Sequence, residues 1–239
     1  MTRTNTRRRS ASADLSLGSG DLFANPAARL PVCIVLDTSG SMFGRPITEL
    51  KEALKRFVAA VDADEDARDS CEMAVISAGG DVTVHPIAVS ANGRPAPSFD
   101  LDRIEAAGQT PLGEAVVVAM SLLTRRKAEL KATGVPYYQP WLVIVSDGQP
   151  TDDTAEAEEQ TRASVRSRSL TVIPVAVGGD ADTERLQALA GGVAPHMLSG
   201  LDFGQLFSWL SASLAAVSRS TPGAEPKIAG ALPWAQHQE

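Results

Sequence analysis

The sequence of 239 residues is poor in the side chains that build thiolate, zinc and acid–base sites. It has two cysteines and three histidines, and their positions show none of the short spacings of zinc ligands. Cys33 and Cys71 both lie in apolar segments, so we expect two buried free thiols and no disulfide. No apolar run approaches the ~18 to 20 residues that span a bilayer, and no apolar stretch follows the N-terminal arginines as in a secretory signal.

Positive charge is also scarce over most of the chain. The net charge is −7, although residues 1–29 carry five Arg against two Asp. The remainder is therefore more acidic than the whole, which argues against binding to nucleic acid. We expect a cytoplasmic protein whose partners include neither nucleic acid nor a membrane.

The chain does contain long apolar runs rich in β-branched residues. Runs of this kind at 31–37, 141–147 and 170–177 are typical of buried parallel strands. Between and after them lie segments with helical spacing of apolar residues or a helix-start signal, namely 46–63, 112–131, 151–167, 182–190 and 203–217. Strands that alternate with helices predict an α/β fold. We expect a doubly wound, Rossmann-like, mostly parallel sheet with helices on both faces.

Several local features refine this prediction. Strand-like runs at 71–77 and 81–89 flank Gly79-Gly80 and predict a β-hairpin, which adds one antiparallel edge strand to the sheet. His85 lies in the second run, and no acidic or thiol side chain is in register with it. Pro174 predicts a bulge or an unpaired side in its strand.

The ends of the helices and of the domain follow from composition. The acidic segment 62–69 predicts a solvated loop, and Thr151, Asp152 and Asp153 predict the cap of the helix that follows them. We expect a flexible Arg/Ser-rich leader at 1–29, one domain at 30–218 and a flexible tail at 219–239.

The candidate functional residues follow the ends of the predicted strands. The first strand stops at Asp37, and Ser39 and Ser41 come next at a spacing of two, separated by Gly40. Thr110 precedes a predicted helix, and Asp147 ends the second long strand. The carboxyl ends of strands are where open α/β sheets bind ligands. Each residue alone could be a cap or a turn, but the set offers only oxygen donors, which suit Mg²⁺.

This set of residues resembles a known family motif. Asp37-Thr38-Ser39-Gly40-Ser41, Thr110 and Asp147 are similar to the Asp-x-Ser-x-Ser…Thr…Asp metal-ion-dependent adhesion site of von Willebrand factor A domains. The resemblance implies a non-catalytic protein-binding module that holds Mg²⁺, with Mn²⁺ or Ca²⁺ as alternatives. In such a module the ion ligates an Asp or Glu of a protein partner.

The residues of two segments resemble one subgroup of this family in particular. Leu-Asp-Thr-Ser-Gly-Ser-Met at 36–42 and Ser-Asp-Gly-Gln-Pro-Thr-Asp-Asp at 146–153 look most like the bacterial tellurite-resistance TerY-type subgroup. That subgroup implies a tellurite or other stress response and an association with a protein kinase and a protein phosphatase. Its longer members carry a cysteine-rich C-terminal zinc module, which this sequence lacks.

Two other functions are compatible with the same residues. A metal-dependent phosphohydrolase of the haloacid-dehalogenase type also places an Asp after a strand, but it needs a second carboxylate two residues later, where this sequence has Ser39. The third reading is an assembly adaptor that works without a metal. Cation-dependent melting would separate it from the metal-dependent readings.

Overall fold

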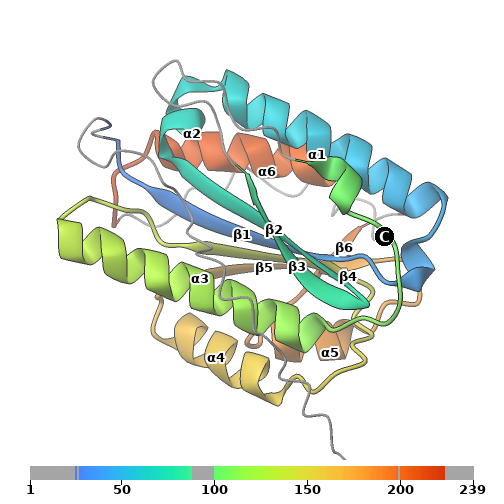
Figure 1. Cartoon of the computed structure of the whole chain (residues 1–239). Helices are drawn as coiled ribbons and strands as arrows, with labels where there is room; N and C mark the ends of the chain where they lie inside the picture. Colours follow the sequence, from blue (N-terminus) through green and yellow to red (C-terminus); the bar gives the residue numbers. More distant parts are fainter. Residues whose placement is uncertain (1–24, 26, 88–99, 199, 224–239) are drawn as a thin grey trace, which may run out of the picture.

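A single sheet forms the centre of the protein, and helices cover both of its faces (Figure 1). The computed structural model describes Asn25 and residues 27–87, 100–198 and 200–223. The six strands of the described chain are ordered β3-β2-β1-β4-β5-β6. They are β1 (Leu30–Asp37), β2 (Cys71–Gly79), β3 (Asp81–Ile87), β4 (Trp141–Ser146), β5 (Thr171–Val177) and β6 (His196–Leu198).

All neighbouring strands run parallel except β2 and β3, which pair antiparallel through a turn at Gly80. The predicted doubly wound, mostly parallel sheet with one antiparallel edge strand is therefore confirmed. The order of the strands places β1 and β4 side by side in the middle. Because they are parallel, their carboxyl ends, at Asp37 and Ser146, lie at the same edge of the sheet.

Two layers of helices enclose the sheet. Figure 1 shows α1, α2 and α6 on one face and α3, α4 and α5 on the other. Their bounds are α1 (Arg45–Ala63), α2 (Glu65–Ser70), α3 (Leu112–Thr133), α4 (Ala155–Arg166), α5 (Thr183–Leu189) and α6 (Phe203–Ser218). Short 3₁₀ turns, η1 (Gly40–Met42) and η2 (Leu101–Arg103), precede α1 and α3.

Each face of the sheet has its own apolar core. Alternate residues of β1 contribute to opposite sides: Ile34 packs under α1 and α6, whereas Cys33 and Val35 pack under α3. Both cysteines are buried and free, as predicted. Burial raises the pKa of both thiols, that of Cys71 to about 12.

Some sequence predictions of local structure were wrong. Segment 62–69 is not a loop throughout, because α2 begins at Glu65 after Asp64, whose Oδ1 accepts a hydrogen bond from the Ala67 amide at 3.0 Å. The prediction for Pro174, by contrast, is confirmed in one of its two forms: β5 has no bulge, but β6 begins only opposite Val175, so Pro174 is unpaired on that side.

Buried polar groups occupy the end of the sheet opposite Asp37. Glu72, at the start of β2, receives two hydrogen bonds from the Arg126 guanidinium, at 2.7 and 2.6 Å. Arg29, which the sequence places in the leader, is buried and lies 3.5 Å from the same carboxylate. These ion pairs fix the chain just before β1 to β2 and α3.

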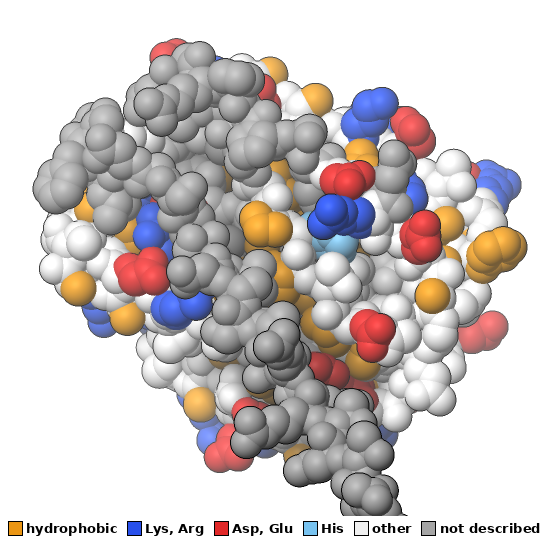
Figure 2. Space-filling view, viewed as in Figure 1, with side chains coloured by type: hydrophobic (Ala, Val, Ile, Leu, Met, Phe, Trp, Pro, Cys, Tyr) orange, Lys and Arg blue, Asp and Glu red, His pale blue; other side chains and the backbone are white. Residues whose placement is uncertain are grey.

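The surface of the described chain is of mixed charge. On the part of the face drawn in Figure 2 that is described, acidic and basic side chains are interspersed. His85 is buried in β3, and its Nε2 lies 2.9 Å from Oγ of Ser77. Within the described ranges, no helix has both the length and the apolar character needed to cross a membrane.

Candidate metal centre

Asp37 is the last residue of β1, and its carboxylate is held from two sides. Oδ1 accepts a hydrogen bond from the Ser39 amide at 2.9 Å, and Oδ2 accepts one from Ser146 Oγ at 2.9 Å. The side chain is buried, with 5% of the residue exposed. The five residues before it are fully buried, so the strand delivers this carboxylate rigidly to the edge of the sheet.

Ser39 and Ser41 present their hydroxyls together. Their Oγ atoms lie 2.9 Å apart, at the 3₁₀ turn that follows β1. Ser39 is buried and Ser41 is exposed, so the pair runs from the interior to the surface. The Gly40 amide donates to the carbonyl of Gly108 at 3.0 Å, which ties this loop to the one that carries Thr110.

Thr110 lies two residues before the start of α3 and is 6% exposed. Its amide donates to Thr151 Oγ1 at 3.1 Å, and its carbonyl accepts from the Thr151 amide at 3.0 Å. Gly108 has a φ of 58°, and an added Cβ would lie 2.7 Å from Cα of Gly80. Only glycine fits this close approach, which holds the Thr110 loop against the hairpin.

Asp147 follows β4 and is half-buried. Its Oδ1 accepts from the Gln149 amide at 3.0 Å, and its carbonyl accepts from the Asp182 amide at 2.7 Å. Gly148 has a φ of 76°, and an added Cβ would lie 2.2 Å from the Asp182 carbonyl oxygen. This tight turn sets the direction in which Asp147 leaves the strand.

The three loops meet at one edge of the sheet. Asp37, Ser41 and Asp147 line a common cavity, and main-chain hydrogen bonds link the Asp37 loop to the Thr110 loop and that loop to Thr151. The structure thus draws the segments of all five predicted ligands to the carboxyl ends of β1 and β4. That these five residues bind one cation stays a prediction.

The electrostatics of Asp37 suit a site for a cation. Burial raises the pKa of Asp37 above its usual value, and the negative charge of Asp147 raises it further. The hydrogen bonds from Ser39 and Ser146 oppose this rise. A positive ion near both carboxylates would relieve this repulsion.

The donor set fits a hard divalent cation and excludes a soft one. Its side chains offer carboxylate and hydroxyl oxygens, without nitrogen or sulfur donors. Across the described ranges, no group of three or more His, Cys, Asp or Glu side chains is placed to hold a metal. A cation at this edge would therefore depend on the serine and threonine hydroxyls.

Three supporting residues were not predicted from the sequence. Ser146 orients Asp37, and Thr151 fixes the Thr110 loop. Asp152 does not cap α4 as expected, because its Oδ1 and Oδ2 accept from the amides of Gly113 and Glu114 at 3.1 and 2.7 Å and so cap α3. Asp153 Oδ1 instead accepts from the Ala155 amide at 3.0 Å, at the start of α4. The signal for Ser146 is a hydroxyl that ends an otherwise apolar strand.

This fold and this edge of the sheet define a class of protein. The chain belongs to the von Willebrand factor type A domain family, whose family model matches residues 32–209. Among curated proteins, inter-alpha-trypsin inhibitor heavy chain H4 of Sus scrofa is 34% identical over 123 residues. That segment is 50% of this chain but only 12% of the pig protein.

Solved structures share the fold at low sequence identity. The von Willebrand factor type A protein from Catenulispora acidiphila matches with a TM-score of 0.58 and 16% identity, over 79% of this chain and 43% of that one. Proximal thread matrix protein 1 from the mussel byssus, with a zinc-occupied MIDAS motif, matches with a TM-score of 0.53 and 16% identity, over 80% and 46%. Manganese-loaded TRAP protein of Plasmodium vivax matches at 0.51 and 15%, over 75% and 71%.

Proposed function

We propose that this chain is a non-catalytic module that binds a protein partner through a divalent cation. The cation would be Mg²⁺ or Mn²⁺, held by Asp37, Ser39, Ser41, Thr110 and Asp147. The observation that carries the proposal is the convergence of their three loops at the carboxyl edge of the sheet, linked by main-chain hydrogen bonds. A bound cation supplies a Lewis-acidic position for an acidic residue of the partner.

The residues of the chain have distinct tasks in this proposal. Asp37 and Asp147 provide negative charge, while the three hydroxyls provide neutral oxygen. Because three of the five donors are neutral, the charge of the cation is not fully compensated, and the cation would bind one more anionic oxygen. Ser41 is exposed, so the site opens to solvent on the side where a partner would approach.

The relatives support this proposal. The family generally consists of non-catalytic interaction modules, and two of the similar structures hold a divalent metal, one of them in its MIDAS motif. The position two residues after Asp37 is Ser39, so the second carboxylate of a phosphohydrolase is missing there. Binding is therefore better supported than the phosphohydrolase alternative.

The biological setting is a further part of the proposal and rests on the resemblance to the TerY-type subgroup alone. We infer a bacterial, cytoplasmic protein of a tellurite or other stress response. Its partners would include a protein kinase and a protein phosphatase. Affinity purification with and without chelator, followed by mass spectrometry, tests this inference, because these partners should be lost when chelator is present.

Thermal melting tests the cation site. We expect Mg²⁺ or Mn²⁺ to raise the Tm relative to EDTA, with about 2.7 kcal/mol of stabilisation when the cation is at 100 times its Kd. Asp37→Ala should abolish this response. Glu159→Ala, an exposed carboxylate of α4, is the matched control and should keep it.

The alternatives give different results. If no divalent cation changes the Tm, either of the wild type or of Asp37→Ala, the result would favour the metal-independent adaptor. Hydrolysis of p-nitrophenyl phosphate that disappears in Asp37→Asn would favour the phosphohydrolase.

A further inference from the structure

An apolar cavity of about 190 Å³ lies beside the candidate metal centre. Asp37, Ser41 and Asp147 form its polar edge. The rest of its lining is mainly apolar and comes from the ends of β1, β4 and β5, from η1, from the start of α1 and from the start of α6 with the loop before it: Leu36, Met42, Pro46, Leu50, Val145, Val177, Leu201 and Phe203. The cavity thus shares three residues with the site, and its lining includes neither Ser39 nor Thr110.

A second apolar feature lies on the same loop. Phe43 follows η1, two residues after Ser41, and is 80% exposed. Among the described residues, Phe43 is the only large apolar side chain that is exposed to solvent. An exposed aromatic ring next to a binding site is a typical anchor of a protein interface, because it buries a large apolar area with few rotatable bonds.

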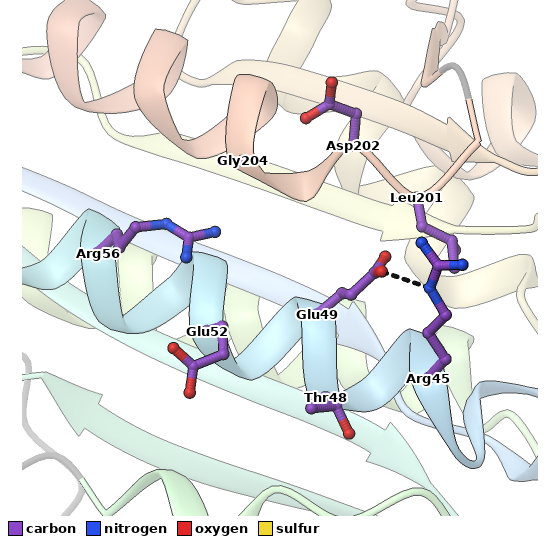
Figure 3. Close-up of a pocket in the computed structure, with 8 residues that line it drawn as sticks. All are labelled: Arg45, Thr48, Glu49, Glu52, Arg56, Leu201, Asp202 and Gly204. Carbon is purple, nitrogen blue, oxygen red and sulfur yellow. Dashed lines mark hydrogen bonds and ion pairs between the residues drawn. The ribbon is translucent and has the colours of Figure 1, made fainter.

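A charged groove borders the cavity at Leu201. Leu201 lines both the cavity and a groove of about 520 Å³ between α1 and the start of α6. Figure 3 shows Arg45 and Glu49 near Leu201 at one end of this groove, joined by an ion pair of 2.6 Å, and Arg56 at the other end. A polypeptide that leaves the cavity over Leu201 would therefore meet charges of both signs.

We propose that this surface selects a polypeptide in which the acidic residue at the metal is followed or preceded by a large aliphatic side chain. The aliphatic side chain enters the cavity, the partner packs on Phe43, and the chain continues into the charged groove. This inference rests on the proposed function, since the carboxylate at the metal fixes the register. Consecutive Cα atoms are about 3.8 Å apart, so a residue next to the bound carboxylate reaches a cavity that begins at the ligands themselves.

A polypeptide explains the combined features better than a small molecule. The metal edge adjoins the cavity through Asp37, and the cavity and the groove share Leu201, so one polypeptide can contact all three. The cavity alone holds a single side chain. It gives specificity for the residue beside the acid, whereas the metal gives specificity for the acid itself.

Fluorescence anisotropy with short labelled peptides tests this proposal. The probes are Gly/Ser peptides with a central Asp and either Leu or Ser at the neighbouring positions, titrated in Mg²⁺ and in EDTA. We expect a Leu peptide to bind about 10-fold or more tightly than its Ser counterpart, and only in Mg²⁺. Phe43→Ala should weaken the Leu peptide severalfold, and unchanged affinity would overturn the role given to Phe43.

Filling the cavity provides the matched variants. Val177→Phe places bulk into the cavity from the end of β5 and should remove the preference for Leu while the Mg²⁺-dependent rise in Tm remains. Val84→Phe makes the same change at a half-buried position of β3, away from the cavity, and should keep the preference.

The outcomes separate the two proposals. Equal affinity for Leu and Ser peptides, or no binding of either by a protein whose Tm rises with Mg²⁺, would overturn this inference and leave the metal site intact. A protein whose Tm does not respond to any divalent cation would instead overturn the proposed function. Loss of the Mg²⁺ response in Val177→Phe would show that the cavity supports the site rather than the partner, which also contradicts this inference.

Discussion

Ser146 Oγ donates a hydrogen bond to Oδ2 of Asp37 at 2.9 Å, across the ends of two adjacent strands. The same oxygen accepts a hydrogen bond from the Gly148 amide at 3.0 Å. One buried hydroxyl therefore orients the first carboxylate of the candidate site and also holds the turn that presents the second, Asp147. This arrangement makes Ser146 a positioning residue that can be tested without removing any predicted ligand.

Ser146→Ala should weaken both the fold and cation binding. The change leaves Oδ2 of Asp37 and the Gly148 amide without their partner, and an unsatisfied buried group destabilises by about 1–3 kcal/mol. Loss of a residue that orients a ligand typically weakens metal affinity by about 10- to 100-fold. Urea unfolding in EDTA measures the first effect, and a Mg²⁺ titration of the Tm measures the second. Ser121→Ala, at an exposed position of α3, is the control and should change neither quantity.

Asp37→Asn should have opposite effects with and without the cation. Burial raises the pKa of Asp37 in the folded state, so the charged carboxylate opposes folding once the pH exceeds its unfolded pKa. In EDTA at neutral pH, the neutral Asn should therefore raise the free energy of unfolding, by about 1.4 kcal/mol for each unit of pKa shift. This gain should disappear as the pH falls through the normal carboxyl range, where Asp37 is protonated in both states.

Saturating Mg²⁺ should reverse that order, because the wild type gains stability from the cation and the variant does not. Denaturant unfolding of the wild type and of the variant at neutral and acidic pH, in EDTA and in Mg²⁺, gives the four comparisons that are needed. A variant that is less stable than the wild type in EDTA at neutral pH would contradict the assignment of a strained, buried charge to Asp37.

Gly148→Ala should destabilise the protein more than an ordinary glycine replacement at positive φ. An added Cβ would lie 2.2 Å from the Asp182 carbonyl oxygen, so the turn after β4 would have to move. Gly134→Ala is the matched control, because its φ of 70° is close to the 76° of Gly148 and no atom lies within 4 Å of its Cβ position. We expect about 1 kcal/mol for Gly134→Ala and clearly more for Gly148→Ala, measured by thermal or urea unfolding.

Glu72→Gln should destabilise the fold without affecting the site. Removing one charge of a buried pair leaves the other uncompensated, at about 3–5 kcal/mol, and here both Arg126 and Arg29 face Glu72. Glu72 lies at the amino end of β2, far along the strands from Asp37. Mg²⁺ should therefore still raise the Tm by the wild-type increment. Glu129→Gln, which alters a half-exposed partner of Arg126, is the control and should have a smaller effect.

The sheet and most helices were predictable because their signals are local. A strand buried on both faces must be apolar throughout, as Val32 to Leu36 are, and an amphipathic helix repeats its apolar residues every three or four positions. The sequence prediction of a solvated loop at 62–69 misses helix α2, because acidic residues favour an exposed loop and a helix start alike. The same residues, Asp64 as cap with Glu65 and Asp66 in the first turn, are also a helix-start signal.

The supporting contacts of the candidate site were not predictable in the same way. Asp152 looks like a cap for the helix that follows it in sequence, but it caps α3, which begins 40 residues earlier at Leu112. Ser146 and Asp37 are 109 residues apart, so nothing in the local pattern links them. The candidate ligands could be named because strands that are parallel deliver their carboxyl ends to one place. Their partners depend on how the loops pack there.

The main-chain bonds that join Gly40 to Gly108 and Thr110 to Thr151 have a regulatory consequence. Since these bonds use no side chain of the proposed ligand set, we expect the loops to keep their shape without a bound cation. Under the proposed function, the protein would stay folded without the cation, and the free cation concentration would set the fraction of molecules that can bind a partner. Such a design responds within the time of ion exchange and needs neither synthesis nor refolding of the chain.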